Sequence, residues 1–392
     1  KTVGVREMYD GAIHLSLNQE RKRLHICAVA RVGPALMIVA LLILVSCGTG
    51  DRMYDSTLAH HTADGFRNSD PSGTRGSFWK WQRERWASGL PKIPDGGYRF
   101  ELLHPDVQRL QTNRTQPTLT WIGHATFLLQ LGGVNILTDA HLTDRASPLS
   151  FAGPKRVVPP ALTFEELPHI DAVVISHNHY DHLDRATVKR LAAQPGGSPH
   201  FYVPLKLRSW FVDQGIENVT ELDWWDEAGI VALKLTLVPV QHWSSRTLWD
   251  RDKTLWGGWV IEQPGFRFFF AGDTGYSSDF QEIGRRFGHI DLAALPIGAY
   301  EPRWFMKTMH ANPEEAVKIH RDLNARHSVG MHWGTFILTD ESLYDPPIKL
   351  TEALRAANIP PEQFFVMKHG ETRRLQEFFS EANRAAETPP PR

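Results

Sequence analysis

The stretch Ser176-His177-Asn178-His179-Tyr180-Asp181-His182 places four metal-binding side chains within six residues of this 392-residue chain. Residues 171–175, directly before it, form a short apolar run with β-branched side chains, which predicts a buried strand. The residues 183–193 that follow have helical spacing. The stretch is therefore expected on a loop at the C-terminal end of a strand, where layered α/β proteins carry their chemistry.

The number of these side chains indicates more than one metal ion. Imidazole and carboxylate groups together suit zinc and similar borderline metals. Four such groups exceed what one catalytic zinc ion usually takes from a protein, so the stretch predicts two metal ions. A polar, histidine-rich surface loop is the alternative, but the pattern H-x-H-x-D-H after a buried strand is too specific to favour it.

Later segments repeat the arrangement of an apolar strand that ends in a metal-binding residue. The strands are expected over residues 233–240, 266–271 and 329–331. They are followed by His242, Asp273 and His332. Glycine residues stand beside Asp273 and near His332, and they allow close approach of the backbone. A single residue of this kind is more often structural, but the series in chain order favours metal binding.

The order H-x-H-x-D-H, His, G-D-T-G, His resembles that of the metallo-β-lactamase fold superfamily. The intervening sequence is closer still to the N-acyl phosphatidylethanolamine-hydrolysing phospholipase D family, and the resemblance covers roughly residues 77–375. The stretches that carry it are 121–126, 241–243, 271–276, 298–307, 312–316 and 332–336. The ligand pattern identifies only the superfamily, whereas the block 298–307 (GAYEPRWFMK) points to this family and is much more specific.

This resemblance implies an α/β (α+β) fold, a four-layer αββα sandwich of two similar halves with the metals at the edge where the sheets meet. It implies a zinc-dependent phosphodiesterase of phospholipase D type. Such an enzyme hydrolyses N-acyl phosphatidylethanolamine or a related phospholipid to phosphatidic acid and an N-acyl ethanolamine. The nucleophile would be a hydroxide between two Zn²⁺ ions, since paired cations lower the pKa of bound water and clamp the oxygens of the displacement.

The resemblance also implies roles for particular residues. One zinc ion would be held by His177, His179 and His242, the other by Asp181, His182 and His332, and Asp273 would bridge both. The catalytic residues would be Asp181, Asp273 and His310, of which His310 would assist the leaving group or hold a phosphate oxygen. The substrate contacts would be Tyr300, Arg303, Trp304 and Phe305. His124, Asp139 and His141 are expected either to orient a ligand imidazole or to be structural.

Composition predicts one large soluble domain, since 42% of residues are hydrophobic and 22% are charged. The formal net charge of −1 gives no global field that would favour nucleic acid. The chain has no G-x-S-x-G elbow and no pair of H-x-K-x₄-D signatures, so a phospholipase D activity would depend on metal. Most of the 13 tryptophans are expected in the core, and those at the surface would contact lipid.

Residues 1–47 are predicted to be a signal peptide with a lipobox. A basic region that contains residues 21–23 precedes an uncharged apolar run of 14 residues, 32–45, which is shorter than a transmembrane helix requires. Residues 44–48 (LVSCG) have the form of a bacterial lipobox, which predicts lipid attachment at Cys47. The expected location is the bacterial cell envelope, at the outer membrane or its periplasmic face, and an uncleaved anchor is the alternative.

The remaining boundaries follow from composition. Residues 48–76 are polar without apolar periodicity and are predicted to be a flexible tether. The hydrolase domain is expected over 77–378 and a disordered tail over 379–392. Residues 78–86 (FWKWQRERW) fit either an amphipathic segment on a membrane or a packed arm. Strands are expected over 119–122, 127–131 and 134–138, with a turn at Gly132-Gly133, and further helices over 279–287 and 313–325.

Two other functions remain open at this point. A binuclear-metal lactonase or esterase would use the same site, because a bridging hydroxide attacks a carbonyl carbon as readily as phosphorus. A non-catalytic envelope lipoprotein would retain the fold alone. The expected partners are a phospholipid substrate and a membrane, which the protein would reach through the lipid anchor and residues 78–86, the Trp-rich segment. Nothing in the sequence determines the oligomeric state.

Overall fold

A computed structural model describes residues 55–71 and 76–379, all of which lie in one compact unit. The predicted lipobox with Cys47, the apolar run 32–45 and residues 380–392 lie outside the described residues. Within the described part of the chain, no helix is long and apolar enough to cross a membrane.

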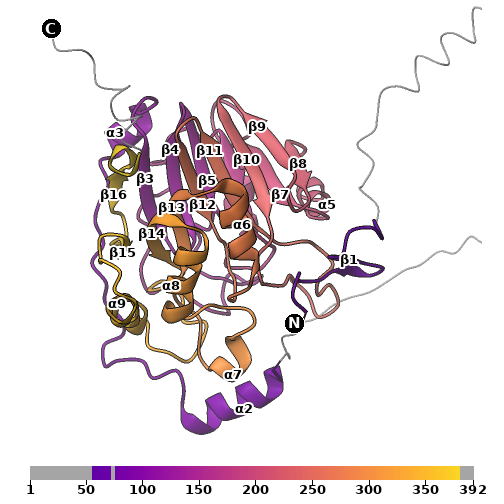
Figure 1. Cartoon of the computed structure of the whole chain (residues 1–392), viewed down its shortest axis with the longest axis vertical. Helices are drawn as coiled ribbons and strands as arrows, with labels where there is room; N and C mark the ends of the chain where they lie inside the picture. The colour runs from indigo at the N-terminus through magenta and orange to yellow at the C-terminus, as the bar shows by residue number, and fades with distance from the viewer. Residues whose placement is uncertain (1–54, 72–75, 380–392) are drawn as a thin grey trace, which may run out of the picture. The chain divides into compact units, whose positions relative to one another are not determined.

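Two seven-stranded sheets form the centre of the fold (Figure 1). The first has the order β16 (Thr372–Arg374), β3 (Thr118–Gly123), β4 (Thr126–Leu131), β5 (Val134–Thr138), β6 (Ala172–Val174), β7 (His200–Pro204) and β8 (Val219–Leu222). The second has the order β15 (Phe364–Val366), β14 (Ala325–Met331), β13 (Ile290–Pro296), β12 (Phe266–Phe270), β11 (Gly258–Gln263), β10 (Leu233–Val238) and β9 (Glu227–Ile230). Each sheet has three antiparallel pairings at one side and three parallel pairings at the other, so the two halves are similar.

The period-two alternation of a strand explains why the first sheet is buried on both faces. Phe127 and Leu129 of β4 belong to the apolar cluster that the two sheets share, whereas Leu128 between them faces a second cluster. The second cluster includes Val188 of α4 (Arg185–Ala192) and Phe211 of α5 (Arg208–Val212), so helices cover the outer face. All six residues of β4 are therefore buried.

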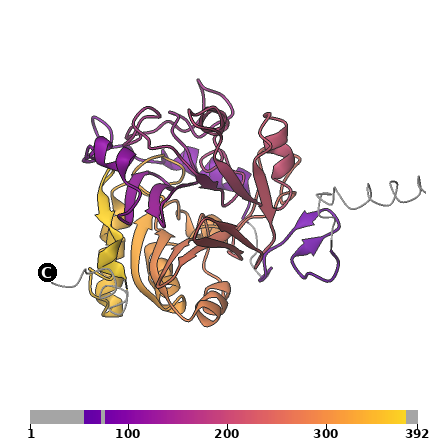
Figure 2. The same ribbon diagram turned by 90° about the horizontal axis from the view of Figure 1, so that it is seen from above.

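Helices also cover the second sheet. The helices α6 (Asp279–Phe287) and α8 (Pro313–Asp322) lie in front of it in Figure 1, and α9 (Asp345–Ala357) packs against α8. Seen from above, the two sheets form adjacent layers with helices outside them (Figure 2). The predicted four-layer sandwich is confirmed by this arrangement. The domain also contains three short helices, namely α3 (Val107–Thr112), α7 (Arg303–Met306) and the 3₁₀ helix η1 (Leu375–Phe378).

Local signals predicted several elements closely. Gly132 and Gly133 have φ of 59° and 78° in the turn between β4 and β5, as a two-residue hairpin turn requires. Asn312 caps α8 in a capping box with Glu315. The helix ends at Asp322 rather than at residue 325, because Ala325 already pairs with β13 as the first residue of β14.

The tether prediction is wrong for residues 55–71, called here the N-terminal segment. It contains the paired strands β1 (His61–Thr62) and β2 (Gly65–Phe66) and packs on the domain. The Nε2 atoms of His60 and His61 lie 2.6 and 2.8 Å from the two carboxylate oxygens of Asp223. Polar composition suggested a solvated chain, but these polar groups have partners that are distant in the sequence.

The Trp-rich segment forms the helix α2 (Phe78–Ser88), which lies beside α7 (Figure 1). Trp81 is buried against Met306 and Met309 and stacks on Phe305, so the helix is a packed arm on one face. Trp79 and Trp86 are 80% and 85% exposed on the same helix. The buried face shows a packed arm, and the exposed tryptophans leave contact with a membrane as a prediction.

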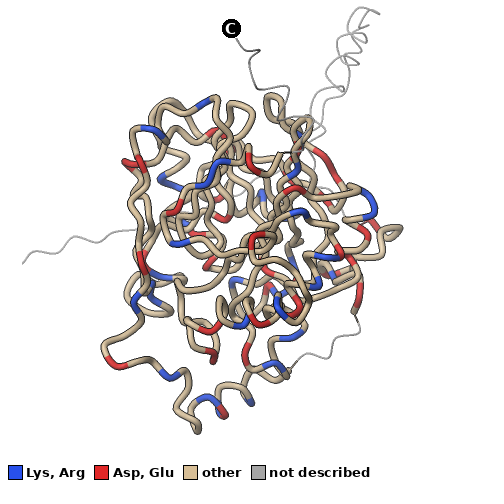
Figure 3. The backbone as a smooth tube through the Cα atoms, turned by 60° about the vertical axis from the view of Figure 1, so that its left-hand side comes forward, with Lys and Arg blue, Asp and Glu red and all other residues tan. Residues whose placement is uncertain are grey.

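Charged side chains are distributed over the whole described chain. Figure 3 shows Lys and Arg interspersed with Asp and Glu along the backbone. The formal net charge of the chain is −1. That nucleic acid is not a partner stays a prediction from the sequence.

Close packing of α6 on α8 gives a stability prediction at Gly284. A Cβ atom at this position would lie 2.2 Å from the backbone oxygen of Asp322. Alanine usually stabilises a helix relative to glycine by about 1 kcal/mol, but here it would force the helices apart. We expect Gly284→Ala to lower the free energy of unfolding by about 1–3 kcal/mol in urea titrations. Gln281→Ala, at an exposed position of the same helix, is the control, and a Gly284→Ala protein as stable as the wild type would contradict the packing argument.

Candidate metal centre

Strand direction brings the predicted ligands to one place. The stretch His177–His182 follows β6 of the first sheet, and His242, Asp273 and His332 follow β10, β12 and β14 of the second. The strand β11 is antiparallel to both β10 and β12, so β10 runs in the same direction as β12, β13 and β14. The carboxyl ends of these strands therefore meet at one edge of the second sheet.

Three histidines converge in the first of two clusters. The Nδ1 atom of His179 lies 2.8 Å from Nε2 of His177 and 3.3 Å from Nε2 of His242. The Nδ1 atom of His242 donates to the carbonyl of Met309 at 2.8 Å. That bond places the proton on Nδ1 and leaves the Nε2 lone pair directed into the cluster.

Burial keeps this first cluster uncharged. It lowers the pKa of His177 and of His242 well below the usual value, and lowers the pKa of His179 to about 3. The three imidazoles are therefore neutral at pH 7, which is the form that binds metal.

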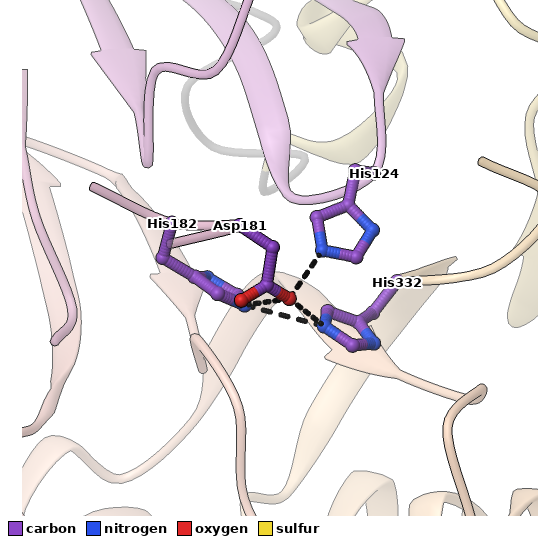
Figure 4. Close-up of side chains that lie close together, drawn as sticks. All are labelled: His124, Asp181, His182 and His332. Carbon is purple, nitrogen blue, oxygen red and sulfur yellow. Dashed lines mark hydrogen bonds and ion pairs between the residues drawn. The ribbon is translucent and has the colours of Figure 1, made fainter. Parts of the chain in front are cut away.

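The second cluster combines a carboxylate with histidines (Figure 4). The Oδ2 atom of Asp181 lies 2.9 Å from Nε2 of His124 and 3.3 Å from Nε2 of both His182 and His332. The Nε2 atoms of His182 and His332 are 3.2 Å apart. The buried carboxylate of Asp139 lies 2.6 Å from Nδ1 of His182, so Nε2 of His182 faces the cluster.

Asp273 lies between the two clusters. Its Oδ2 atom is 3.1 Å from Nε2 of His182 and 4.0 Å from Nε2 of His242, and its Oδ1 atom is 3.0 Å from Nε2 of His332. One carboxylate thus reaches residues of both clusters. This is the position that a bridging ligand requires.

The charge balance of the second cluster supports a cation there. Burial alone would raise the pKa of Asp273, but His182 and His332 hold it well below the usual value. Burial would likewise lower the pKa of His332, yet the Asp273 carboxylate raises it to about 9. Buried carboxylates that require protonated imidazoles as partners would be balanced equally by a metal ion, so the residues present fit metal cations.

Strained backbone marks the same region. His124, Asp139 and His332 have φ of 56°, 33° and 61°, in the left-handed region that side chains other than glycine rarely adopt. Such conformations persist where the surroundings hold them, and they cluster at functional sites. The sequence left the role of His124 and Asp139 open; the structure gives each a direct contact with a predicted ligand.

The four predicted substrate contacts differ from one another in burial and in their partners. The guanidinium of Arg303 pairs with Glu315 at 2.6 Å and donates to the carbonyl of His310 at 2.8 Å, so it holds the loop of His310 rather than an open site. Tyr300 is buried, and Phe305 stacks on the indole of Trp81 with centroids 5.0 Å apart. Trp304 is 41% exposed and is the one of the four that presents substantial apolar surface.

Comparison with known proteins first defines the class. Residues 134–333 match the family described as beta-lactamase superfamily domain. The fold is similar to that of a metallo hydrolase from the hyperthermophilic archaeon Ignicoccus hospitalis, at 24% identity and a TM-score of 0.50, over 66% of this chain and 98% of that chain. Together with the site, these matches define a metal-dependent hydrolase with the metallo-β-lactamase fold.

Relatives then specify the family. The N-acyl-phosphatidylethanolamine-hydrolyzing phospholipase D 1 of Caenorhabditis elegans is 45% identical over 258 residues, which cover 63% of this chain and 72% of that protein. The mitochondrial N-acyl-phosphatidylethanolamine-hydrolyzing phospholipase D of Saccharomyces cerevisiae is 38% identical over 238 residues, 59% of this chain and 50% of that protein. The chain belongs to the N-acyl-phosphatidylethanolamine-hydrolysing phospholipase D family.

Metal binding by the metal-free protein should strengthen as pH rises towards about 9. Below that pH the imidazole of His332, whose pKa is raised to about 9, carries a proton that a metal must displace. Each proton released makes the apparent affinity roughly tenfold higher per pH unit. Calorimetric titration with Zn²⁺ in buffers of different ionisation enthalpy measures both affinity and proton release. Affinity that does not change between pH 6 and 9, with no protons released, would contradict displacement of a proton from His332 by the metal.

Proposed function

We propose that this metal-dependent hydrolase is a zinc-dependent phosphodiesterase of phospholipase D type. Its substrate would be N-acyl phosphatidylethanolamine or a related phospholipid, and its products phosphatidic acid and an N-acyl ethanolamine. The observation that carries the proposal is the position of Asp273, whose carboxylate lies 3.1 Å from His182 and 4.0 Å from His242, one residue of each cluster. The relatives named for this phospholipid support the choice of substrate.

We propose two Zn²⁺ ions per chain, because the donors fall into two groups and imidazole nitrogens dominate both. When bound, the ions would supply a water molecule activated near neutral pH and would offset the negative charge of the phosphodiester. Asp181 and Asp273 would provide the anionic ligands. No serine or cysteine nucleophile is needed for such a reaction.

His310 is the residue best placed to act on the substrate itself. Its Nδ1 atom lies 3.8 Å from Oδ2 of Asp273 and is buried without a hydrogen-bond partner. Its backbone is held by Arg303, as described above, so the ring has a fixed approach to the centre. We propose that the imidazole of His310 donates a hydrogen bond to a phosphate oxygen or a proton to the leaving alkoxide.

Lipid analysis tests the proposed reaction directly. Purified protein loaded with Zn²⁺ is incubated with N-acyl phosphatidylethanolamine, plain phosphatidylethanolamine and a neutral lactone or ester, and the products are identified by mass and by phosphorus-31 spectra. We expect phosphatidic acid and N-acyl ethanolamine from the first lipid. Asp273→Asn, which removes the anionic position between the clusters, should lose metal and activity together. Turnover of the lactone or ester alone would favour the other hydrolase function.

We also propose lipid attachment at Cys47 and a location in the bacterial cell envelope, on the support of the lipobox in residues 44–48. In a bacterial host, Cys47→Ser should leave an uncleaved precursor that incorporates no labelled palmitate. The matched control is Cys27→Ser, which leaves the lipobox intact. Identical migration of wild type and Cys47→Ser, with no label in either, would exclude the anchor.

A further inference from the structure

The N-terminal segment reaches the metal centre through the side chain of Asn68. The Oδ1 atom of Asn68 accepts a hydrogen bond from the backbone N–H of His242 at 3.0 Å, and Nδ2 donates to the carbonyl of His242 at 2.8 Å. The same Oδ1 accepts from Nε1 of Trp256 at 3.0 Å. One carboxamide therefore satisfies both backbone polar groups of a predicted ligand.

The segment is held on the domain at further points near His242. The side chain of Gln241 donates to the carbonyl of Asp70 at 3.1 Å, and the N–H of Phe66 donates to the carbonyl of Asp252 at 2.8 Å. A Cβ atom on Gly65 would lie 2.0 Å from that carbonyl oxygen, so the two backbones are in close contact. The contact of Asn68 is thus part of a packed interface rather than of a loose chain.

The histidine pair at the start of the segment anchors it by hydrogen bonds and not by a metal ion. Nδ1 of His61 accepts the backbone N–H of Asp55 at 3.1 Å, so in the neutral ring the proton lies on Nε2. That proton is donated to Asp223 at 2.8 Å. The ring therefore has no free lone pair for a cation, although the group of His60, His61 and Asp223 has the composition of a metal site.

These contacts determine where the imidazole of His242 can lie. His242 is buried, and its ring is fixed by the bond from Nδ1 to Met309 while its backbone is fixed by Asn68. Without Asn68 the backbone N–H and C=O of His242 would lose their partners away from water. The peptide would then shift to find new ones and would carry the ring with it.

We propose that Asn68 is a positioning residue of the metal centre, so that the N-terminal segment completes the cluster of His177, His179 and His242. The inference rests on His242 as a metal ligand and not on the identity of the substrate. It assigns a role in metal binding to residues that precede the stretch 134–333 matched by the superfamily. It also means that removal of residues 1–76 would damage the metal centre as well as any anchor.

Zn²⁺ titration of the full-length metal-free protein tests this role. In Asn68→Ala we expect one of the two ions to bind about tenfold or more weakly and the other to bind as in the wild type. Substitution with Co²⁺ should show a changed absorption spectrum for the weakened ion. Thr57→Ala, which removes a polar contact at the exposed start of the same segment, is the control and should bind both ions normally. Asn68→Asp keeps the acceptor for His242 and Trp256, guards against failure to fold, and should give an intermediate affinity.

The alternatives give different results. A wild-type protein that binds two ions and an Asn68→Ala protein that binds both equally well would overturn the positioning role and leave the proposed function intact. Equal weakening of both ions together with a lower Tm of the metal-free variant would also overturn it, because the segment would then support the fold as a whole. A wild-type protein that binds no metal would overturn the proposed function as well.

Discussion

The buried carboxylate of Asp139 holds the loop that carries the candidate metal ligands. Its Oδ1 atom accepts the backbone N–H of Ser176 at 2.7 Å, and its Oδ2 atom lies 2.6 Å from both Oγ of Ser176 and Nδ1 of His182. Because β5 and β6 are parallel neighbours, Asp139 and Ser176 leave the first sheet at the same edge. The carboxylate of Asp139 thereby fixes Ser176 at the start of the histidine-rich loop and the imidazole of His182 near its end.

The two clusters differ in electrostatic character. In the cluster of His177, His179 and His242, burial outweighs the attraction of the nearby Asp273 carboxylate and lowers the pKa of each ring. The cluster of His182 and His332 shares its space with carboxylates, and these raise the pKa of both rings above the usual value. A pair of cations is suited to such a site, because one position is rich in nitrogen donors and the other supplies negative charge.

Local pattern predicted much of the fold and the composition of the candidate site. Apolar runs predicted the strands, and the residues that follow them in the sequence lie together at the strand ends. The prediction of a tether failed for residues 55–71, because composition reports only the average polarity of a segment. The sequence placed Arg303 among the substrate contacts and did not predict its pairing with Glu315, because a charged side chain has many possible partners until the chain is folded.

Apolar periodicity and side-chain chemistry, which act over a few neighbouring residues, were enough to predict the strands and the candidate metal-binding side chains. The four-layer sandwich was predicted from the resemblance to the metallo-β-lactamase fold superfamily. The contact of Asn68 with His242 and the contact of His124 with Asp181 could be seen only in the folded chain. Asn68 and His242 are 174 residues apart, and a hydrogen bond between such distant residues leaves no periodic signal in the sequence. Asn68 and His242 come together only when the two sheets and the N-terminal segment have packed.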